Sequence, residues 1–338
     1  MSAEVDEAKL ARELSRSFGV SGTISRIHSG TATDNFQVDA GPGQRWFAKV
    51  YRDQSVLPDE LAAIDLTTFA GSRGVPVPAL HPTVTGHRIS DTGDIAMSLW
   101  EYVEGAETAE LGLSGGRWAT VGAVLGTMHR HLAQHPAYRP SSRPATALCD
   151  LPAAQARYDQ LIEAYRHRPA LDDDQAWALD TALHRRSLLP QVEPILLSLP
   201  PQNVQIAHGD LAAPNVMMRG DDVAAVIDFQ PPSPHFVAWE IARIGCDPRT
   251  IASGTDWLTG LSLLLDAYEQ ENPAVHIDLR AVVTTGCAYT LASTYPLSAP
   301  LKPPTVDHAG LIQYGHDRHR AALEMLEVLR TDTRVHDR

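Results

Sequence analysis

Three polar residues in the second half of the chain have the types and spacing of a site that could handle phosphate. Asp210 lies five residues before Asn215, in a loop opened by His208-Gly209, and Asp228 follows an apolar run. Amide and carboxylate oxygens are ligands that Mg²⁺ prefers. Phosphoryl transfer needs little beyond a metal on the phosphates and a carboxylate that aligns the attacking hydroxyl. Because an isolated Asp-x4-Asn usually caps a turn, the indication depends on all these residues occurring together.

A β-hairpin is predicted between these residues. Asp221-Asp222 separates two apolar runs, and a turn at that pair would place Gly220 opposite Val223 and Asn215 opposite Asp228. Directly opposed residues of paired strands have Cβ atoms about 4.5–5.5 Å apart. Side chains at that separation can share one divalent cation, and Asp210, at the mouth of the same hairpin, can reach a hydroxyl beside it.

Lys49 is the cation best placed by the sequence to bind phosphate. The chain has only three lysines among 28 basic residues, and this one lies in the alternating segment 46–51, which predicts a β-strand. A lysine buried in a sheet is costly unless an anion meets it, although a lysine at a strand edge can also extend to solvent. We expect an acidic partner on the next helix. Glu60 is preferred and Asp65 is the alternative, because the spacing allows both.

The order of predicted elements indicates an α+β protein. Strands are expected at 23–28, 36–40, 44–51, 82–90 and 94–103, and helices at 6–18 and 58–73. After Gly105 the expected helices are 114–133, 152–168, 173–198, 237–245, 254–271, 278–293 and 309–330, with a β insertion at 204–229. This predicts a β-rich N-terminal lobe, residues 1–102, and a larger, mostly helical C-terminal lobe, residues 103–338, which carries the loop and hairpin at 203–229.

The run from His208-Gly209-Asp210 to Asn215, followed by Ile227-Asp228-Phe229, resembles the aminoglycoside phosphotransferase family of small-molecule kinases. The resemblance implies a bilobal protein-kinase-like fold that binds ATP, or another nucleoside triphosphate, together with Mg²⁺. It also implies that Asp210 is the catalytic base or orients the hydroxyl, that Asn215 and Asp228 hold the metal, and that His208 is mainly structural.

The same resemblance assigns the nucleotide contacts. The strand lysine and its acidic partner would bind the phosphates, hydroxyls of the loop between the first two strands would cover them, and backbone groups of the linker between the lobes would hold the base. The residues assigned to these roles are Lys49, Glu60, Thr31, Thr33, Glu101 and Val103.

The chain departs from the family pattern in two places. Ala212-Ala213-Pro214 replaces the frequent His-Pro-Gly of the loop, and beyond Asp228 the chain has Phe236 and Glu240 where the family often has Asp. These departures leave the base and the metal ligands in place, so we expect an active enzyme.

Composition excludes several other classes of function. A net charge of −13 without a basic stretch argues against nucleic-acid binding, and no apolar run is long enough to cross a bilayer. The N-terminus lacks the pattern of a secretory signal, and the three scattered cysteines are typical of reduced thiols in a cytoplasmic protein.

The acceptor is expected to be a hydroxyl of a small molecule, such as an antibiotic or a metabolite, and a negative surface tolerates a cationic one. Two alternatives stay open at this point: a kinase for Ser or Thr hydroxyls of a peptide, and a nucleotide-binding scaffold without activity. The C-terminal helices carry the side chains that could contact an acceptor, although helix surfaces and cores have such residues anyway. They are Asp247, Asp256, Asp266, Glu269, Glu271, Trp239, Tyr289, Tyr295 and Tyr314.

Overall fold

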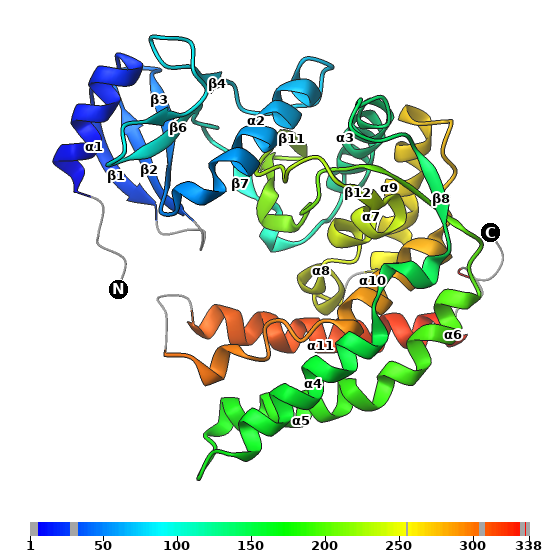
Figure 1. The fold of residues 1–338 in the computed structure, drawn as a ribbon. Helices are drawn as coiled ribbons and strands as arrows, with labels where there is room; N and C mark the ends of the chain where they lie inside the picture. The colour runs from blue at the N-terminus through cyan, green and yellow to red at the C-terminus, as the bar shows by residue number, and fades with distance from the viewer. Residues whose placement is uncertain (1–5, 28–32, 255, 304–307, 332–334, 336–338) are drawn as a thin grey trace. The chain divides into compact units, whose positions relative to one another are not determined.

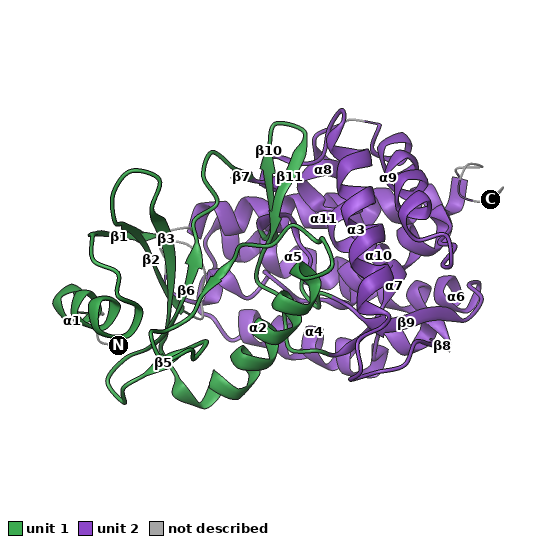
Figure 2. Ribbon diagram, turned by 90° about the horizontal axis from the view of Figure 1, so that it is seen from above, with its two compact units in different colours: residues 1–107, 208–210, 215–232 green, residues 108–207, 211–214, 233–338 purple. Residues whose placement is uncertain are grey.

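The computed structural model describes residues 6–27, 33–254, 256–303, 308–331 and 335 (Figure 1). The chain forms two compact units (Figure 2). The first contains residues 1–107, 208–210 and 215–232, and the second contains residues 108–207, 211–214 and 233–338. The mixed architecture, with an antiparallel sheet in the N-terminal part and a mostly helical remainder, confirms the predicted α+β class.

An antiparallel sheet is the centre of the first unit. Its main strands are β1 (Thr23–Ile27), β2 (Thr33–Asp39), β3 (Arg45–Tyr51) and β6 (Ala96–Glu101). The order is β1-β2-β3-β6-β4, with β4 at Leu80–His81, and the short β5 (Ser90–Asp91) also pairs with β6. Gly41 and Gly43 have φ values of 127° and 71°, which a non-glycine residue rarely adopts, so they make the tight connection between β2 and β3.

The two faces of this sheet are covered by different helices. Leu10 of α1 (Glu7–Glu13), with Leu14 and Phe18 of the following π-helical turn (Leu14–Phe18), packs on one face, against a core that includes Ala48 and Val50. Because successive side chains of a strand point to opposite faces, Lys49 projects from the other face. Figure 1 shows α2 (Leu57–Gly71) on the side of the sheet opposite α1.

A second small sheet completes the first unit. β10 (Val216–Arg219) and β11 (Asp222–Val226) form a hairpin, in a sheet of order β11-β10-β7 with β7 at Glu107–Thr108. The Val226 N–H donates to the Pro76 carbonyl at 2.7 Å. This bond ties the hairpin to the N-terminal part of the chain. Residues 215–232, predicted to belong to the C-terminal lobe, are in the first unit, which extends to Glu107 rather than to residue 102.

Helices build the second unit. They are α3 (Arg117–Leu132), α4 (Leu151–Arg166), α5 (Asp173–Leu188), α6 (Val192–Leu197), α7 (Val237–Gly245), α8 (Pro248–Ala252), α9 (Trp257–Glu271), α10 (Leu279–Ala292) and α11 (His308–Thr331). Several begin at an aspartate whose side chain accepts a backbone N–H of the first turn, a common start signal: Asp150, Asp172, Asp256 and Asp278. A small sheet of order β12-β9-β8 completes the unit, with β8 at Ser141–Arg143, β9 at Gln202–Ile206 and β12 at Pro234–Phe236.

The core of the second unit lies around α10, of whose fourteen residues twelve are buried. A helix that is apolar on all sides is typical of a core position. Close contact of α3 with α9 depends on glycine, because a Cβ on Gly122 would lie 2.1 Å from the Leu264 carbonyl oxygen. His129 of α3 is fully buried and bonds to Glu240 at 2.8 Å and to Tyr268 at 3.2 Å, which is a packing role.

Two predicted elements were wrong. Residues 82–90 are not one strand, because Gly86, at φ 83°, makes a turn between the short β4 (Leu80–His81) and β5 (Ser90–Asp91). The helix predicted at 173–198 divides at Leu189–Gln191, since Pro190 has no N–H to continue the helical ladder. No helix among the described residues is long and apolar enough to span a membrane.

Candidate active site

Lys49 lies between two carboxylates within the first unit. Its Nζ is 3.2 Å from Glu60 Oε2 and 2.9 Å from Asp228 Oδ1. Burial disfavours the charged ammonium, but the carboxylates of Asp228 and Glu60 outweigh burial and raise the pKa of Lys49 above its ordinary value. The lysine therefore stays charged at any working pH. Of the two acidic residues considered from sequence, Glu60 is thus the one in contact, while Asp65 pairs with Arg88 at 2.7 Å.

His208 holds the loop to the hairpin. It is fully buried, its Nδ1 accepts the Asp210 N–H at 3.2 Å, and its Nε2 lies 2.8 Å from the Ile227 carbonyl oxygen. These contacts assign the proton to Nε2. The ring also packs on Phe229, with centroids 4.4 Å apart. Both ring nitrogens are engaged with backbone, so His208 positions the loop and is not available as a base.

Asn215 closes the loop from the other end. Its Nδ2 donates to the backbone carbonyl of Asp210 at 2.8 Å, across the short 3-10 turn Ala213–Asn215. This bond orients the amide so that its donor is used within the loop, which leaves Oδ1 as the atom for a cation. The backbone of Asp210 is therefore held by His208 on one side and by Asn215 on the other.

The hairpin register differs from the predicted one. The turn is formed by Gly220-Asp221, with Gly220 at φ 63°, so Arg219 and not Gly220 begins the pairing, opposite Asp222. An irregularity between Met217 and Met218 then shifts the ladder by one residue. As a result Ile227 faces Asn215, its N–H donating to the Asn215 carbonyl at 3.0 Å, and Asp228 lies one residue further.

Asp228 has an unusual backbone conformation. Its φ of 63° is the only positive value at a described non-glycine residue. Such a conformation is sparsely populated and persists where neighbouring contacts determine it. On the two sides of Asp228, Ile227 is bonded to Asn215 and the Gln230 N–H donates to the His208 carbonyl at 2.9 Å. The loop thus fixes the carboxylate that contacts Lys49.

The residues present fit a Mg²⁺ ion. With Nδ2 of Asn215 and Oδ1 of Asp228 engaged elsewhere, each side chain keeps one oxygen for a metal. Within the described residues no group of three or more His, Cys, Asp and Glu side chains could hold an ion. Two protein oxygens, completed by phosphate and water oxygens, is a donor set that Mg²⁺ commonly takes.

The remaining nucleotide candidates have different surroundings. Thr31 lies outside the described residues. Thr33 is the first residue of β2, is buried, and donates its hydroxyl to Asn35 Oδ1 at 3.0 Å, so that proton is not directed to a phosphate. The Glu101 N–H donates to the Ala79 carbonyl at 2.8 Å, whereas the N–H of Val103 has no backbone acceptor among the described residues.

Sequence reasoning missed the residues that lie beside Lys49 on the same face of the sheet. Tyr51, two positions along the same strand face, bonds to Ser98 at 2.8 Å, and burial raises its pKa above the ordinary value. Its ring lies 5.9 Å from Lys49 Nζ. Alternation along β3 could have indicated Tyr51, because residues two apart share a face, but the partner strand could not be inferred.

Comparisons with known proteins match most of the chain. A family model described as "Phosphotransferase enzyme family" matches residues 23–274. A homoserine kinase of Methylobacillus glycogenes is 26% identical over 252 residues, which cover 74% of this chain and 71% of that protein.

Solved structures share the fold at low identity. A spectinomycin phosphotransferase in complex with ADP and spectinomycin has a TM-score of 0.67 at 12% identity, covering 95% of this chain and 98% of the other. An amicoumacin kinase in complex with AMP-PNP and Ca²⁺ has a TM-score of 0.60 at 14% identity, covering 95% of this chain and 94% of the other.

Proposed function

The chain belongs to the phosphotransferase enzyme family and is a kinase, and from this premise we propose that it transfers the γ-phosphate of ATP to a hydroxyl group of a small molecule. The relatives it resembles include proteins named for an amino acid substrate and for antibiotic substrates. These names support a small hydroxylated acceptor and do not select one class.

The observation that carries the proposal is the contact of Lys49 with both Glu60 and Asp228, at 3.2 Å and 2.9 Å. It joins the strand lysine to the loop that also holds Asp210 and Asn215. A cation, two oxygen ligands and a carboxylate are the parts that phosphoryl transfer requires. A scaffold that binds a nucleotide without transferring its phosphate would have no use for the Asp210 carboxylate.

We assign roles to these residues as follows. Lys49 binds the non-transferred phosphates, and Glu60 keeps its ammonium group oriented. Asn215 Oδ1 and the remaining oxygen of Asp228 hold Mg²⁺, which when bound neutralises charge on the phosphates. The N–H of Val103 and the carbonyl of Glu101 hold the base, and the backbone of the loop around Thr31 and Thr33 covers the phosphates.

Asp210 acts on the acceptor. Its carboxylate accepts the hydrogen bond of the acceptor hydroxyl and aligns the oxygen with the γ-phosphorus. The new O–P bond forms as the bond between the γ-phosphorus and the bridging oxygen breaks, the nucleoside diphosphate leaves, and the hydroxyl proton passes to the Asp210 carboxylate. The contacts from His208 and Asn215 to the backbone of Asp210 keep that carboxylate in place.

The test is acceptor-dependent ADP release by the full chain with ATP and Mg²⁺, measured across a panel of hydroxylated amino acids, amino alcohols and antibiotics. The Asp210→Asn variant should bind ATP as the wild type does and lose transfer by about 10²–10⁴-fold. Asp222→Asn, at an exposed position in β11 of the adjoining hairpin, is the matched control and should transfer normally. Wild-type transfer by Asp210→Asn would contradict the assigned role.

A further inference from the structure

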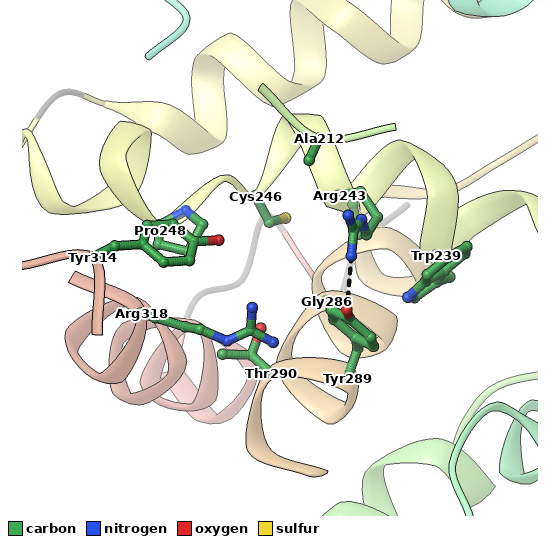
Figure 3. Close-up of a pocket in the computed structure, with 11 residues that line it drawn as sticks. Ala212, Trp239, Arg243, Cys246, Pro248, Gly286, Tyr289, Thr290, Tyr314 and Arg318 are labelled. Carbon is green, nitrogen blue, oxygen red and sulfur yellow. Dashed lines mark hydrogen bonds between the residues drawn. The ribbon is translucent and has the colours of Figure 1, made fainter. Parts of the chain in front are cut away.

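A cavity within the second unit is lined by side chains of α7, α10 and α11 (Figure 3). Its lining includes Trp239, Arg243, Tyr289 and Arg318, and Ala212 of the loop that follows Asp210. Three aromatic residues considered from sequence as acceptor contacts, Trp239, Tyr289 and Tyr314, therefore do lie at one cavity. The two arginines were not anticipated, because they come from helices far apart in the sequence.

Among the described residues, Arg318 and Trp239 are side chains at this cavity with buried N–H groups that have no acceptor. Arg318 is 4% exposed, and neither its Nε nor its Nη2 has a hydrogen-bond acceptor among the described residues. Its guanidinium carbon lies 5.2 Å from the ring centre of Tyr289 and 5.8 Å from that of Tyr295. Aromatic faces stabilise a cation, but they do not accept its in-plane N–H groups, which are costly to leave unbonded when buried.

The positive charge around Arg318 exceeds the nearby negative charge. Arg243 also lines the cavity and donates to the Tyr289 hydroxyl at 2.7 Å. Arg185, packed nearby, is fully buried, its Nη2 has no acceptor within the described residues, and burial lowers its pKa to about 10. Three arginines thus meet in one desolvated region.

The acidic groups of this region are already engaged. Asp247, which is 2% exposed, accepts the Arg249 N–H at 2.9 Å, and its other oxygen is 3.8 Å from Arg249 Nη1. Glu110 is bonded to the same arginine at 2.9 Å. Glu240 of α7 is bonded to His129. Arg249 therefore balances part of this negative charge, and Arg318 has no carboxylate within hydrogen-bond distance among the described residues.

The size of the cavity limits what can bind to Arg318. Its volume is about 40 Å³, and one water-sized group needs at least about 10–15 Å³. The cavity therefore has room for a few such groups, enough for the three heavy atoms of a carboxylate. Ala212 in its wall is two residues from Asp210, so their Cα atoms are at most about 7 Å apart.

We propose that the acceptor is a small hydroxylated carboxylic acid whose carboxylate binds Arg318 in this cavity. This inference rests on the proposed function, because it names the substrate class of that activity. The charge of the cavity is opposite to the net charge of the chain, −13, so a surface that tolerates cations surrounds a buried site suited to an anion.

The first arm of the test needs no variant. Transfer by the wild-type chain is compared between L-serine, L-homoserine and D-glycerate and the primary amide of each, with ethanolamine and spectinomycin as cationic acceptors. A charge-assisted hydrogen bond lost in a buried site corresponds to about tenfold or more in kcat/KM, so the acids should exceed their amides by at least that factor. Equal use of the amides, or use of the cationic acceptors alone, would overturn the proposal.

The second arm uses Arg318→Met, with Arg320→Met as control, since Arg320 is on the same helix and its side chain is 58% exposed. Arg318→Met should lose the preference for the acid while its Tm stays equal or rises, because an arginine whose Nε and Nη2 have no acceptor among the described residues is costly to bury. A merely structural arginine would instead lower the Tm and leave the preference unchanged. Arg320→Met should change neither quantity.

Binding of each acid and amide, measured by calorimetry with AMP-PNP and Mg²⁺, separates this proposal from the proposed function. Transfer without preference for the acid would refute the carboxylate site and leave the kinase assignment intact. Acid binding that depends on Arg318, without transfer to any acceptor, would support the site and refute the proposed function. The absence of both binding and transfer would refute the carboxylate site and the proposed function together.

Discussion

Replacing Lys49 by methionine tests the centre of the proposed site. Methionine keeps most of the side-chain length and removes the charge that contacts Glu60 at 3.2 Å and Asp228 at 2.9 Å. Each contact has a Coulomb energy of about 5–6 kcal/mol at an effective dielectric constant of 20. Most of that energy is offset by the desolvation of the three charged groups.

The exposed fractions of the Glu60 and Asp228 side chains indicate how much stability the unliganded protein loses with the lysine. The side chains of Glu60 and Asp228 are 24% and 45% exposed, so water can solvate both carboxylates once the lysine is gone. We therefore expect Lys49→Met to lower the free energy of unfolding by about 1–2 kcal/mol. For a chain of this size that is a decrease of a few degrees in Tm.

The effect on the nucleotide complex should be larger. Two charge-assisted hydrogen bonds from Lys49 to phosphate, at about 1.5 kcal/mol each, correspond to about 100-fold in affinity. At an ATP concentration 100 times the wild-type Kd, binding stabilises the wild type by about 2.7 kcal/mol, and a 100-fold weaker variant by about 0.4 kcal/mol. The Tm gain produced by ATP and Mg²⁺ should therefore almost disappear.

The assay is thermal unfolding with and without ATP and Mg²⁺, combined with kcat/KM for ATP in the transfer reaction. Lys9→Met, an exposed lysine of α1 in the same unit, is the control and should behave as the wild type does. A Lys49→Met variant with the full nucleotide-dependent Tm gain and unchanged kcat/KM would refute the assignment of Lys49 to the phosphates.

Three further outcomes are expected. Asp228→Asn should raise the Mg²⁺ concentration needed for half-maximal transfer by about tenfold or more, because a charged ligand is lost; an unchanged Mg²⁺ titration would exclude Asp228 as a ligand. Gly122→Ala should lower Tm by several degrees, since its Cβ would lie 2.1 Å from the Leu264 carbonyl oxygen. Replacing the exposed Gly220, at φ 63°, by alanine should lower the free energy of unfolding by about 1 kcal/mol or more, from backbone strain alone. Hydrogen bonding from Arg52 holds the pKa of Asp34 below its ordinary value, so this carboxylate stabilises the fold above the unfolded pKa of about 3.9 and the contribution is lost as pH falls towards the lower folded value. In urea unfolding, Asp34→Asn should therefore lose less stability than the wild type between about pH 5 and 3. An unchanged dependence of stability on acid pH would contradict this.

Local sequence patterns determined most elements and the identity of the reactive loop. Alternation around Lys49, the glycines after β2 and the aspartates that begin the helices act over a few residues, so they can be interpreted without the fold. The predicted strand at 82–90 and the helix at 173–198 were wrong where one residue, Gly86 or Pro190, interrupts a longer pattern.

Tertiary structure decided which side chains meet. The hairpin register depended on a one-residue irregularity between Met217 and Met218, and the choice of Glu60 over Asp65 depended on how α2 packs on the sheet. The cavity at Arg318 brings together residues more than 100 positions apart. Such contacts arise because burial and chain topology, and not spacing along the sequence, determine which charged groups lose water together.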